Sequence, residues 1–156
     1  MGNPFVHIEL NTGDVARAKD FYQAVFDWKL KDMPMGPGMT YIMLDPGKQP
    51  GGGIQQKQMP NAPTQWLPYV EVPDVKQAIA KAEQNGAMIV VPYMQIGPNG
   101  SLGIFIDPTG ASLGVWTPAP GAAKPPPAKA AGKSAAKKAP ARKKAAPKKK
   151  KGKKRR

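Results

Sequence analysis

Two stretches of the chain, roughly sixty residues apart, show the same order of apolar and polar positions. Residues 5–10 (FVHIEL) and 67–72 (LPYVEV) each have the branched and aromatic content of a short strand. Residues 14–18 (DVARA) and 74–78 (DVKQA) follow, with apolar residues at helical spacing behind an aspartate that suits a helix N-terminus. This internal repeat predicts two copies of one strand–helix unit, whose equivalent strands present equivalent side chains to a central space.

Further strands are expected after each predicted helix, because short apolar runs alternate there with glycine- and proline-rich turns. In the first half we predict strands at 5–10, 28–33, 41–44 and 51–58, a helix at 14–27 and a loop over 33–38. In the second half we predict strands at 66–72, 88–92, 103–106 and 111–116 and a helix at 74–85. Each half therefore has the order strand, helix and three strands, which is an α+β organisation.

Strand alternation divides residues 5–10 into two faces. Phe5, His7 and Glu9 are expected on one face, whereas the intervening aliphatic residues are expected to pack against the first helix. The apolar stripe predicted for the first helix consists of Val15, Ala18, Tyr22, Val25 and Phe26. The stripe predicted for the second helix consists of Val75, Ala78, Ile79 and Ala82.

The charge of the chain is divided unevenly at residue 118. Residues 119–156 contain 13 lysines, three arginines and no acid, whereas residues 1–118 contain eight basic and ten acidic residues. The net charge of +14 therefore originates in the C-terminal segment, and the remainder is weakly acidic. The C-terminal segment has no aromatic or branched aliphatic residue to bury, so we predict a disordered basic tail after one folded domain.

Composition also bears on the compartment. The chain has no cysteine, which excludes disulfides and thiolate metal ligands. The N-terminus shows no basic region followed by an apolar run, and no apolar stretch approaches the ~20 residues that span a bilayer. We therefore expect a cytoplasmic protein without membrane contact, with association with the nucleoid as an option because of the basic tail.

The order of elements and several short motifs resemble the vicinal-oxygen-chelate (VOC) superfamily, which includes glyoxalase I, extradiol dioxygenases and bleomycin-resistance proteins. The motifs are the segments 6–9 (VHIE), 18–22 (AKDFY), 26–28 (FDW), 51–54 (GGGI), 105–110 (FIDPTG) and 114–116 (GVW). The resemblance implies two βαβββ modules, about residues 4–59 and 66–118, that form a cup-shaped mixed β-sheet. It covers the domain of residues 1–118 and not the tail of residues 119–156.

The resemblance also implies where a metal site would lie, on the first and last strands of each half, with His and Glu as typical ligands. Only His7 matches such a position. Tyr69 is its equivalent in the second half, and Gly53 and Gly114 lie where carboxylates are usual. Because a divalent catalytic metal usually needs about three protein ligands, we expect no metal and no other cofactor, and metal binding is the alternative.

Three side chains are candidates for catalysis, namely His7, Glu9 and Glu71. One of the glutamates would act as a general base if burial raised its pKa. The alternative is that His7 is a hydrogen-bonded pocket residue and that the glutamates are solvated or paired with lysine. The residues expected to bind a small molecule in the cup are His7, Tyr41, Gly53, Tyr69, Phe105, Gly114 and Trp116, with the glycines leaving open space. The aromatic residues among them would otherwise be core.

The basic tail predicts attraction to a polyanion. Because lysine and arginine are accompanied by no stacking side chain, we expect nonspecific association with nucleic acid. The expected contacts are Lys137, Lys138, Arg142, Lys143, Lys144, Lys148, Lys149, Lys150, Lys151, Lys153, Lys154, Arg155 and Arg156. The Lys-Ala-Pro composition resembles the tails of linker histones, and a solvated arm without a dedicated partner is the alternative.

Three functions are therefore open. The first is a small-molecule-binding protein of the bleomycin-resistance kind, with a tail that associates with nucleic acid. The second is an enzyme, either a metal-dependent lyase or dioxygenase or one that uses Glu9, Glu71 or His7 directly. The third is a nucleoid-associated protein that acts mainly through its tail. The resemblance to the VOC superfamily also allows a homodimer.

Overall fold

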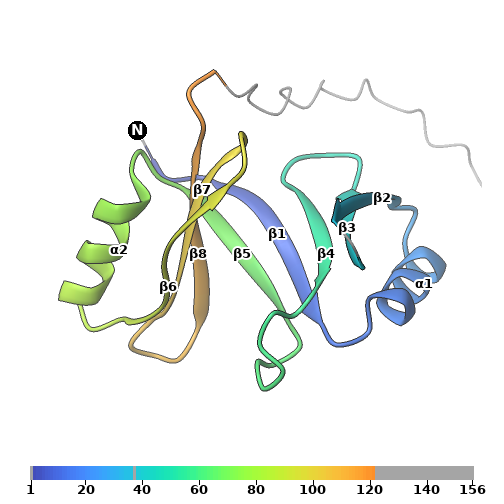
Figure 1. Cartoon of the computed structure of the whole chain (residues 1–156), viewed down its shortest axis with the longest axis horizontal. Helices are drawn as coiled ribbons and strands as arrows, with labels where there is room; N and C mark the ends of the chain where they lie inside the picture. Colours follow the sequence, from blue (N-terminus) through green and yellow to red (C-terminus); the bar gives the residue numbers. More distant parts are fainter. Residues whose placement is uncertain (1, 37, 122–156) are drawn as a thin grey trace, which may run out of the picture.

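The computed structural model describes residues 2–36 and 38–121 (Figure 1). The first half contains β1 (Phe5–Thr12), α1 (Val15–Val25), β2 (Lys29–Gly36), β3 (Met39–Asp45) and β4 (Gly51–Gln56). The second half contains β5 (Gln65–Glu71), α2 (Val75–Gln84), β6 (Met88–Ile96), β7 (Gly100–Ile106) and β8 (Ser112–Pro118). The predicted α+β fold with two βαβββ modules is confirmed. The predicted disorder of the tail concerns residues outside the described ranges, apart from residues 119–121.

The strands form one mixed sheet of eight strands in the order β2-β3-β4-β1-β5-β8-β7-β6. The first and last strands of each half pair in parallel, β1 with β4 and β5 with β8. The two halves join at the centre, where β1 and β5 run antiparallel and His7 lies opposite Tyr69. The equivalent positions of the repeat are therefore direct neighbours across the middle of the sheet.

Both helices begin behind the aspartate that the sequence places there. Asp14 Oδ1 accepts a hydrogen bond from Arg17 N at 2.9 Å, and Asp74 Oδ1 accepts one from Gln77 N at 3.0 Å. Each contact satisfies a backbone donor that has no partner within the helix. In the part of the chain that the structure describes, no helix is long and apolar enough to cross a membrane.

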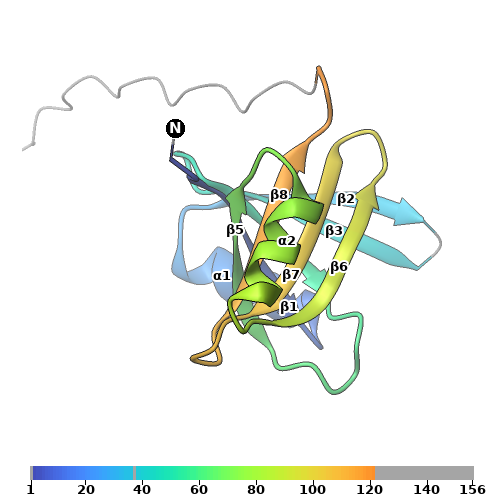
Figure 2. The same cartoon turned by 90° about the vertical axis from the view of Figure 1, so that its left-hand side faces the viewer.

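The two helices cover the same face of the curved sheet (Figures 1 and 2). α1 packs on a core cluster made of Leu10, Ile42 and Ile54. α2 packs on β6, β7 and β8, and its core cluster is made of Val72, Val75, Ile79 and Val115. The other face of the sheet has no helix over it and contains the predicted site.

The apolar stripe predicted for the first helix is wrong at its C-terminal end. Val25 and Phe26 are 51% and 44% exposed. The helix ends at Val25, and Phe26 follows in an extended conformation, with its ring stacked on Trp28 at a centroid distance of 4.5 Å. α1 therefore has no fully buried residue, whereas α2 buries Val75 and Ile79.

The loop predicted over residues 33–38 is also wrong in its first part, because β2 continues to Gly36. Its pairing with β3 extends from Lys29 opposite Asp45 to Gly36 opposite Met39, with a register shift after Pro34. β2 lies at the end of the sheet, and an edge strand tolerates a proline because one side of its backbone has no partner strand.

Candidate functional site

The helix-free face of the sheet is concave at its centre, and we call it the cup. Glu9, Leu67 and Tyr69 are only 7%, 3% and 4% exposed although no helix covers them. Figure 1 shows the sheet curving away from the two helices, which lie on its outer side. The neighbouring side chains of this curved face therefore bury the central ones. We call His7, Glu9, Asn11, Tyr41, Gln55 and Tyr69, which lie there together, the polar floor.

The Glu9 carboxyl group is the centre of a hydrogen-bond network. Glu9 Oε1 accepts from Gln55 Nε2 at 2.7 Å, from Tyr69 Oη at 3.2 Å and from Asn11 Nδ2 at 3.3 Å. Glu9 Oε2 accepts from Tyr41 Oη at 3.3 Å. Four donors from β1, β3, β4 and β5 thus hold one buried carboxylate, which compensates much of the cost of removing it from water.

His7 extends this network to the open side of the cup. Its Nε2 lies 2.7 Å from Tyr41 Oη. The roles in this contact depend on the tautomer of His7; in the tautomer protonated at Nε2, the ring donates to Tyr41 Oη and Nδ1 is left without a proton. Nδ1 has no hydrogen-bond partner among the described residues, and none of their fully buried side-chain polar atoms lacks one, so Nδ1 is not fully buried. The arrangement presents a hydrogen-bond acceptor to the cup.

Burial dominates the electrostatics of the polar floor. It raises the pKa of the Glu9 carboxyl above its ordinary value, and the four hydrogen bonds offset part of this shift. Burial, and then the neighbouring Glu9 charge, raises the pKa of Tyr41 and of Tyr69, so both phenols keep their protons and act as donors. Burial lowers the pKa of His7 below its ordinary value of 6.5, which keeps the imidazole neutral near pH 7.

The space predicted to be open beside the glycines is filled by tyrosine rings. A Cβ atom on Gly114 would lie 2.2 Å from the Tyr69 ring, and one on Gly53 would lie 2.0 Å from Tyr41 Oη. Each half thus seats a tyrosine ring on the glycine of its last strand. The predicted open space is corrected to a packed floor, because only a residue without a side chain fits beneath either ring.

The residues of the floor do not fit the divalent metal that a fold of this kind implies. The described residues contain no group of three histidine, cysteine, aspartate or glutamate side chains that could hold a metal ion. Of the four ligand positions only His7 has a metal-binding side chain, since Tyr69, Gly53 and Gly114 occupy the others. Both Glu9 oxygens already accept hydrogen bonds, so this carboxylate is not free to complete a set.

The two candidate glutamates are not brought together. Glu71 lies at the end of β5, where its backbone N–H donates to the carbonyl of Pro4 at 2.9 Å. Pro4 and Glu9 are five residues apart along an extended chain, a distance of about 16 Å, so Glu71 lies far from Glu9. Trp116 pairs with Glu71 and lies on the cup face two residues beyond Gly114, away from the polar floor.

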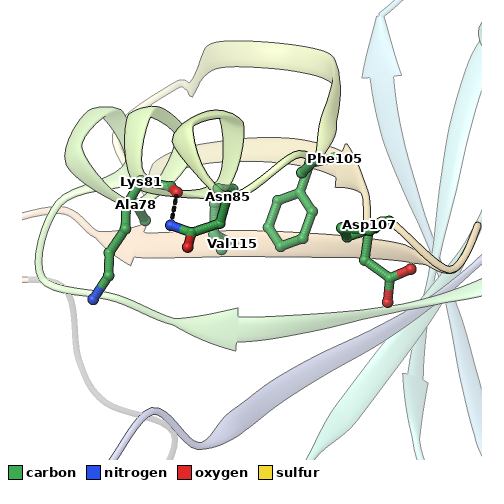
Figure 3. A pocket seen from close by; sticks show the side chains of 9 residues that line it. Ala78, Lys81, Asn85, Phe105, Asp107 and Val115 are labelled. Atoms are coloured by element: carbon green, nitrogen blue, oxygen red, sulfur yellow. Dashed lines mark hydrogen bonds between the residues drawn. The ribbon is translucent and has the colours of Figure 1, made fainter.

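Phe105 lies on the opposite face from the cup, and its predicted place there is corrected. It packs against the core beneath α2 (Figure 3). Ile104 pairs with Gly114 and faces the cup, so the next residue along the strand must face α2. Phe105 and Val115 line a hollow of about 330 Å³ beside α2, and a second hollow of about 340 Å³ lies beside α1. Both hollows are on the helical face.

Two members of the floor, Asn11 and Gln55, were missed by the sequence interpretation. Asn11 follows Glu9 by two residues, and Gln55 follows Gly53 by two residues, so strand alternation places each on the cup face. The register pairs Asn11 with Gln55 directly. The signal was therefore present in the alternation, but only the parallel pairing of β1 with β4 shows that the two amides meet.

Two βαβββ modules in one curved sheet, with a polar floor between their first strands, define a protein of the two-module α+β class to which glyoxalases belong. A family model for the Glyoxalase/Bleomycin resistance protein/Dioxygenase superfamily matches residues 5–115. The chain belongs to this superfamily.

Curated relatives agree with this assignment. The chain is 32% identical over 114 residues to the protein named "Putative glyoxylase CFP32" of Mycobacterium bovis, in a match that covers 70% of this chain and 43% of the relative. It is 27% identical over 125 residues to the "Anthracycline biosynthesis protein DnrV" of Streptomyces peucetius, covering 69% and 44%. The chain thus matches less than half the length of each relative.

Solved structures show the same fold at low sequence identity. The hypothetical protein BH1468 from Bacillus halodurans has a TM-score of 0.60 and 13% identity, with 79% of this chain and 99% of that chain covered. Methylmalonyl-CoA epimerase from Mycobacterium tuberculosis has a TM-score of 0.55 and 14% identity, with coverage of 74% and 88%. At these identities the comparison establishes the fold and not the activity.

Proposed function

We propose that the cup binds a small organic molecule above the polar floor, without a divalent metal. The observation that supports this most strongly is the network of Glu9, a carboxyl group 7% exposed and held by four donors. A buried polar network is costly unless every member is satisfied, and perturbed titratable groups cluster at functional sites. Its partners His7 and Tyr41, which are only partly buried, would contact the ligand.

The hydrogen bonds of the floor favour a ligand that has a hydrogen-bond donor. In the tautomer protonated at Nε2, His7 Nδ1 is an acceptor without a partner among the described residues, and the Tyr41 hydroxyl behind it donates to Glu9. A ligand hydroxyl or amide N–H would therefore bind to His7 Nδ1. The same chain of contacts would stabilise an imidazolium if His7 took a proton from the ligand, which is the enzymatic alternative.

The names of the curated relatives agree with a small organic ligand, since one is called a glyoxylase and another an anthracycline biosynthesis protein. The chain spans less than half the length of either relative, so the activity of the whole relative is not transferred. The metal chemistry usual in the superfamily is not part of the proposal, because the donor set of the floor does not fit it.

The single histidine provides a direct test. We would follow the ring signals of His7 by NMR in the full chain while screening neutral hydroxy- and oxo-substituted organic molecules. Molecules that bind should shift these signals. Tyr41→Phe should lower their binding affinity about tenfold, because His7 loses its hydrogen-bond partner. Tyr93→Phe is the matched control, since Tyr93 is an exposed tyrosine of β6 whose hydroxyl donates to Gln95 and not to the polar floor. Binding that is equally strong in both variants would contradict the proposal.

Metal titration separates this function from a metal-dependent enzyme. Zn²⁺, Ni²⁺ and Mn²⁺ would be titrated into the full chain and into His7→Ala by calorimetry. We expect no stoichiometric binding that depends on His7. One equivalent bound tightly and lost in His7→Ala, together with metal-dependent turnover of the glutathione–methylglyoxal hemithioacetal, would overturn the metal-free proposal.

We further propose that residues 119–156 associate nonspecifically with nucleic acid, because this segment contains 16 basic residues and no acid. Lysines and arginines that neutralise phosphates release counterions, so affinity should fall steeply as salt rises. The body has a net charge near −2 and would contribute little attraction.

This proposal is tested in the full chain with duplex DNA. Replacing Lys148, Lys149, Lys150 and Lys151 by glutamine should lower the slope of log affinity against log salt by roughly 3 to 4. The matched control replaces four lysines of the folded part, Lys29, Lys31, Lys48 and Lys81, by glutamine. An equal loss of slope in both variants would show that the tail is not the binding segment.

A further inference from the structure

Methionines line the cup face at one end of the sheet. Met33 pairs with Tyr41, and Met43 pairs with Gly53, so both share the face of these floor positions. Met39 precedes Tyr41 by two residues and lies on the same face by strand alternation. Three methionines of the β2–β3 hairpin therefore border the polar floor on one side.

Methionines also line the cup face at the other end. Met88 pairs with Ile106, and Met94 pairs with Leu102. Ile104 pairs with Gly114 and faces the cup. Leu102 and Ile106 are each two residues from Ile104 along the strand, so they face the cup as well. β6, however, is the fourth strand from β1, and Met94 is level with Trp116, away from the polar floor. We therefore call only the three methionines of the β2–β3 hairpin, Met33, Met39 and Met43, the methionine walls.

The walls are unusually exposed for apolar side chains. Met33, Met39 and Met43 are 40%, 52% and 41% exposed. Exposed apolar residues that gather on one face mark an interaction surface, whereas scattered ones need no explanation. Methionine is unbranched and polarizable, so a methionine surface adapts its shape to its ligand and makes favourable contacts with aromatic rings.

We propose that the methionine walls hold a neutral, planar aromatic molecule over the polar floor, with a hydroxyl edge directed at His7. The proposal rests on the function proposed above and specifies its ligand. A flat ring contacts sulfur atoms along its edges and leaves the hydroxyl free to donate to Nδ1. An anion is disfavoured because the polar floor contains no lysine or arginine and an acidic residue, Glu9, lies directly behind His7 and Tyr41.

The concave shape favours a small molecule over a second copy of this chain as the occupant. A symmetric dimer pairs the same patch with itself, which requires a self-complementary surface. Two concave faces placed together would leave a void between them. The polar floor at the bottom of the cup would also remain unpartnered in such a dimer.

The test uses the full chain with ¹³C-labelled methionine methyl groups and 2-naphthol as the probe. An aromatic ring shifts the methyl signals that lie against its face or edge. We expect shifts at the methionine walls and at the His7 ring, and none at Met59. Met59 is the matched control, because it is 55% exposed but lies between β4 and β5, outside the walls.

Substitutions make the test quantitative. Met33→Gln and Met43→Gln replace exposed side chains without burying a polar group, and each should weaken 2-naphthol about fivefold, whereas Met59→Gln should not. Naphthalene-2-sulfonate should bind about tenfold more weakly than 2-naphthol, because it has no hydroxyl to donate to His7. Equal affinity in all three glutamine variants, or no binding of 2-naphthol up to its solubility, would overturn the proposal.

The failure of this inference is distinguishable from that of the proposed function. Molecules that shift the His7 ring but leave the wall methyl groups unchanged would refute the methionine walls alone. Wall shifts that depend on protein concentration in the absence of probe would show that a second copy occupies the cup. Molecules that shift neither set of signals would refute the cup as a binding site.

Discussion

Gly114→Ala tests the packing on which the polar floor depends. The new methyl group would lie 2.2 Å and 2.4 Å from two atoms of the Tyr69 ring, which is far inside van der Waals contact. The ring cannot yield easily, because Tyr69 is 4% exposed and its hydroxyl donates to Glu9 at 3.2 Å. The substitution must therefore displace the ring, break this hydrogen bond, or separate β5 from β8.

The expected loss of stability follows from these contacts. Overpacking a well-filled site costs about 1–3 kcal/mol, and losing a hydrogen bond to a charged group costs about 1.5–3 kcal/mol. Replacing glycine by alanine in a strand stabilises the fold by roughly 0.5–1 kcal/mol, because alanine loses less backbone entropy on folding. We therefore expect a net destabilisation of about 3 kcal/mol, which would lower the urea midpoint by about 1.5 M if the m-value is near 2 kcal/mol/M.

The assay is urea unfolding followed by tryptophan fluorescence, with a double-mutant cycle to Tyr69→Val. Once the ring is absent, Gly114→Ala should cost almost nothing, so the coupling between the two changes should be about 2 kcal/mol or more. Gly13→Ala is the control, because its new methyl group would meet only Lys57 Cε at an ordinary 3.6 Å. If Gly114→Ala and Gly13→Ala have the same stability, the ring does not lie over Gly114 and the packed floor is wrong.

Three further predictions concern stability and are measured by the same unfolding assay. Because the pKa of Glu9 is raised in the folded protein, this residue stabilises the fold fully when the pH is below its ordinary pKa of 4.5. This contribution to the free energy of unfolding is lost as the pH rises through the folded-state pKa. Glu9→Gln should therefore gain stability relative to the wild type between pH 5 and pH 8; a constant difference would show that the Glu9 pKa is not raised. Ile79→Ala should cost about 2–5 kcal/mol and the exposed Val25→Ala less than about 0.5 kcal/mol, and similar costs would contradict the weaker packing of α1. Asp32→Asn removes a surface ion pair to Lys19 and should cost less than about 0.5 kcal/mol, so a larger loss would mean that this pair anchors α1 to β2.

The internal repeat predicts much of what the structure shows. It predicts two βαβββ modules and the equivalence of His7 and Tyr69, and the structure places these two residues opposite each other on β1 and β5. Alternation alone also predicts that Glu9 faces away from the first helix. These features follow from local patterns, because strand periodicity and helix spacing are set by the backbone.

The misplacement of Phe105 occurs where the sequence has no alternation. In β7, Leu102, Ile104 and Ile106 face the cup, and Gly103 and Phe105 face α2, so residues 102–106 are apolar on both faces. A strand that is apolar on both faces gives no signal for which face a residue occupies. The place of Phe105 is decided instead by the pairing of β7 with β8, which is information from distant parts of the chain.

The glycines and tyrosines of the floor are best understood as linked pairs. Tyr41 lies over Gly53 and Tyr69 over Gly114, and both tyrosines donate to the same Glu9 carboxylate. A carboxylate side chain at either glycine would have to occupy the volume of the ring above it. The absence of ligands at these positions and the presence of the two phenols are therefore one structural feature. The phenols provide hydrogen-bond donors to the buried Glu9, so the floor is held together by hydrogen bonds at the positions where the family resemblance implies metal ligands.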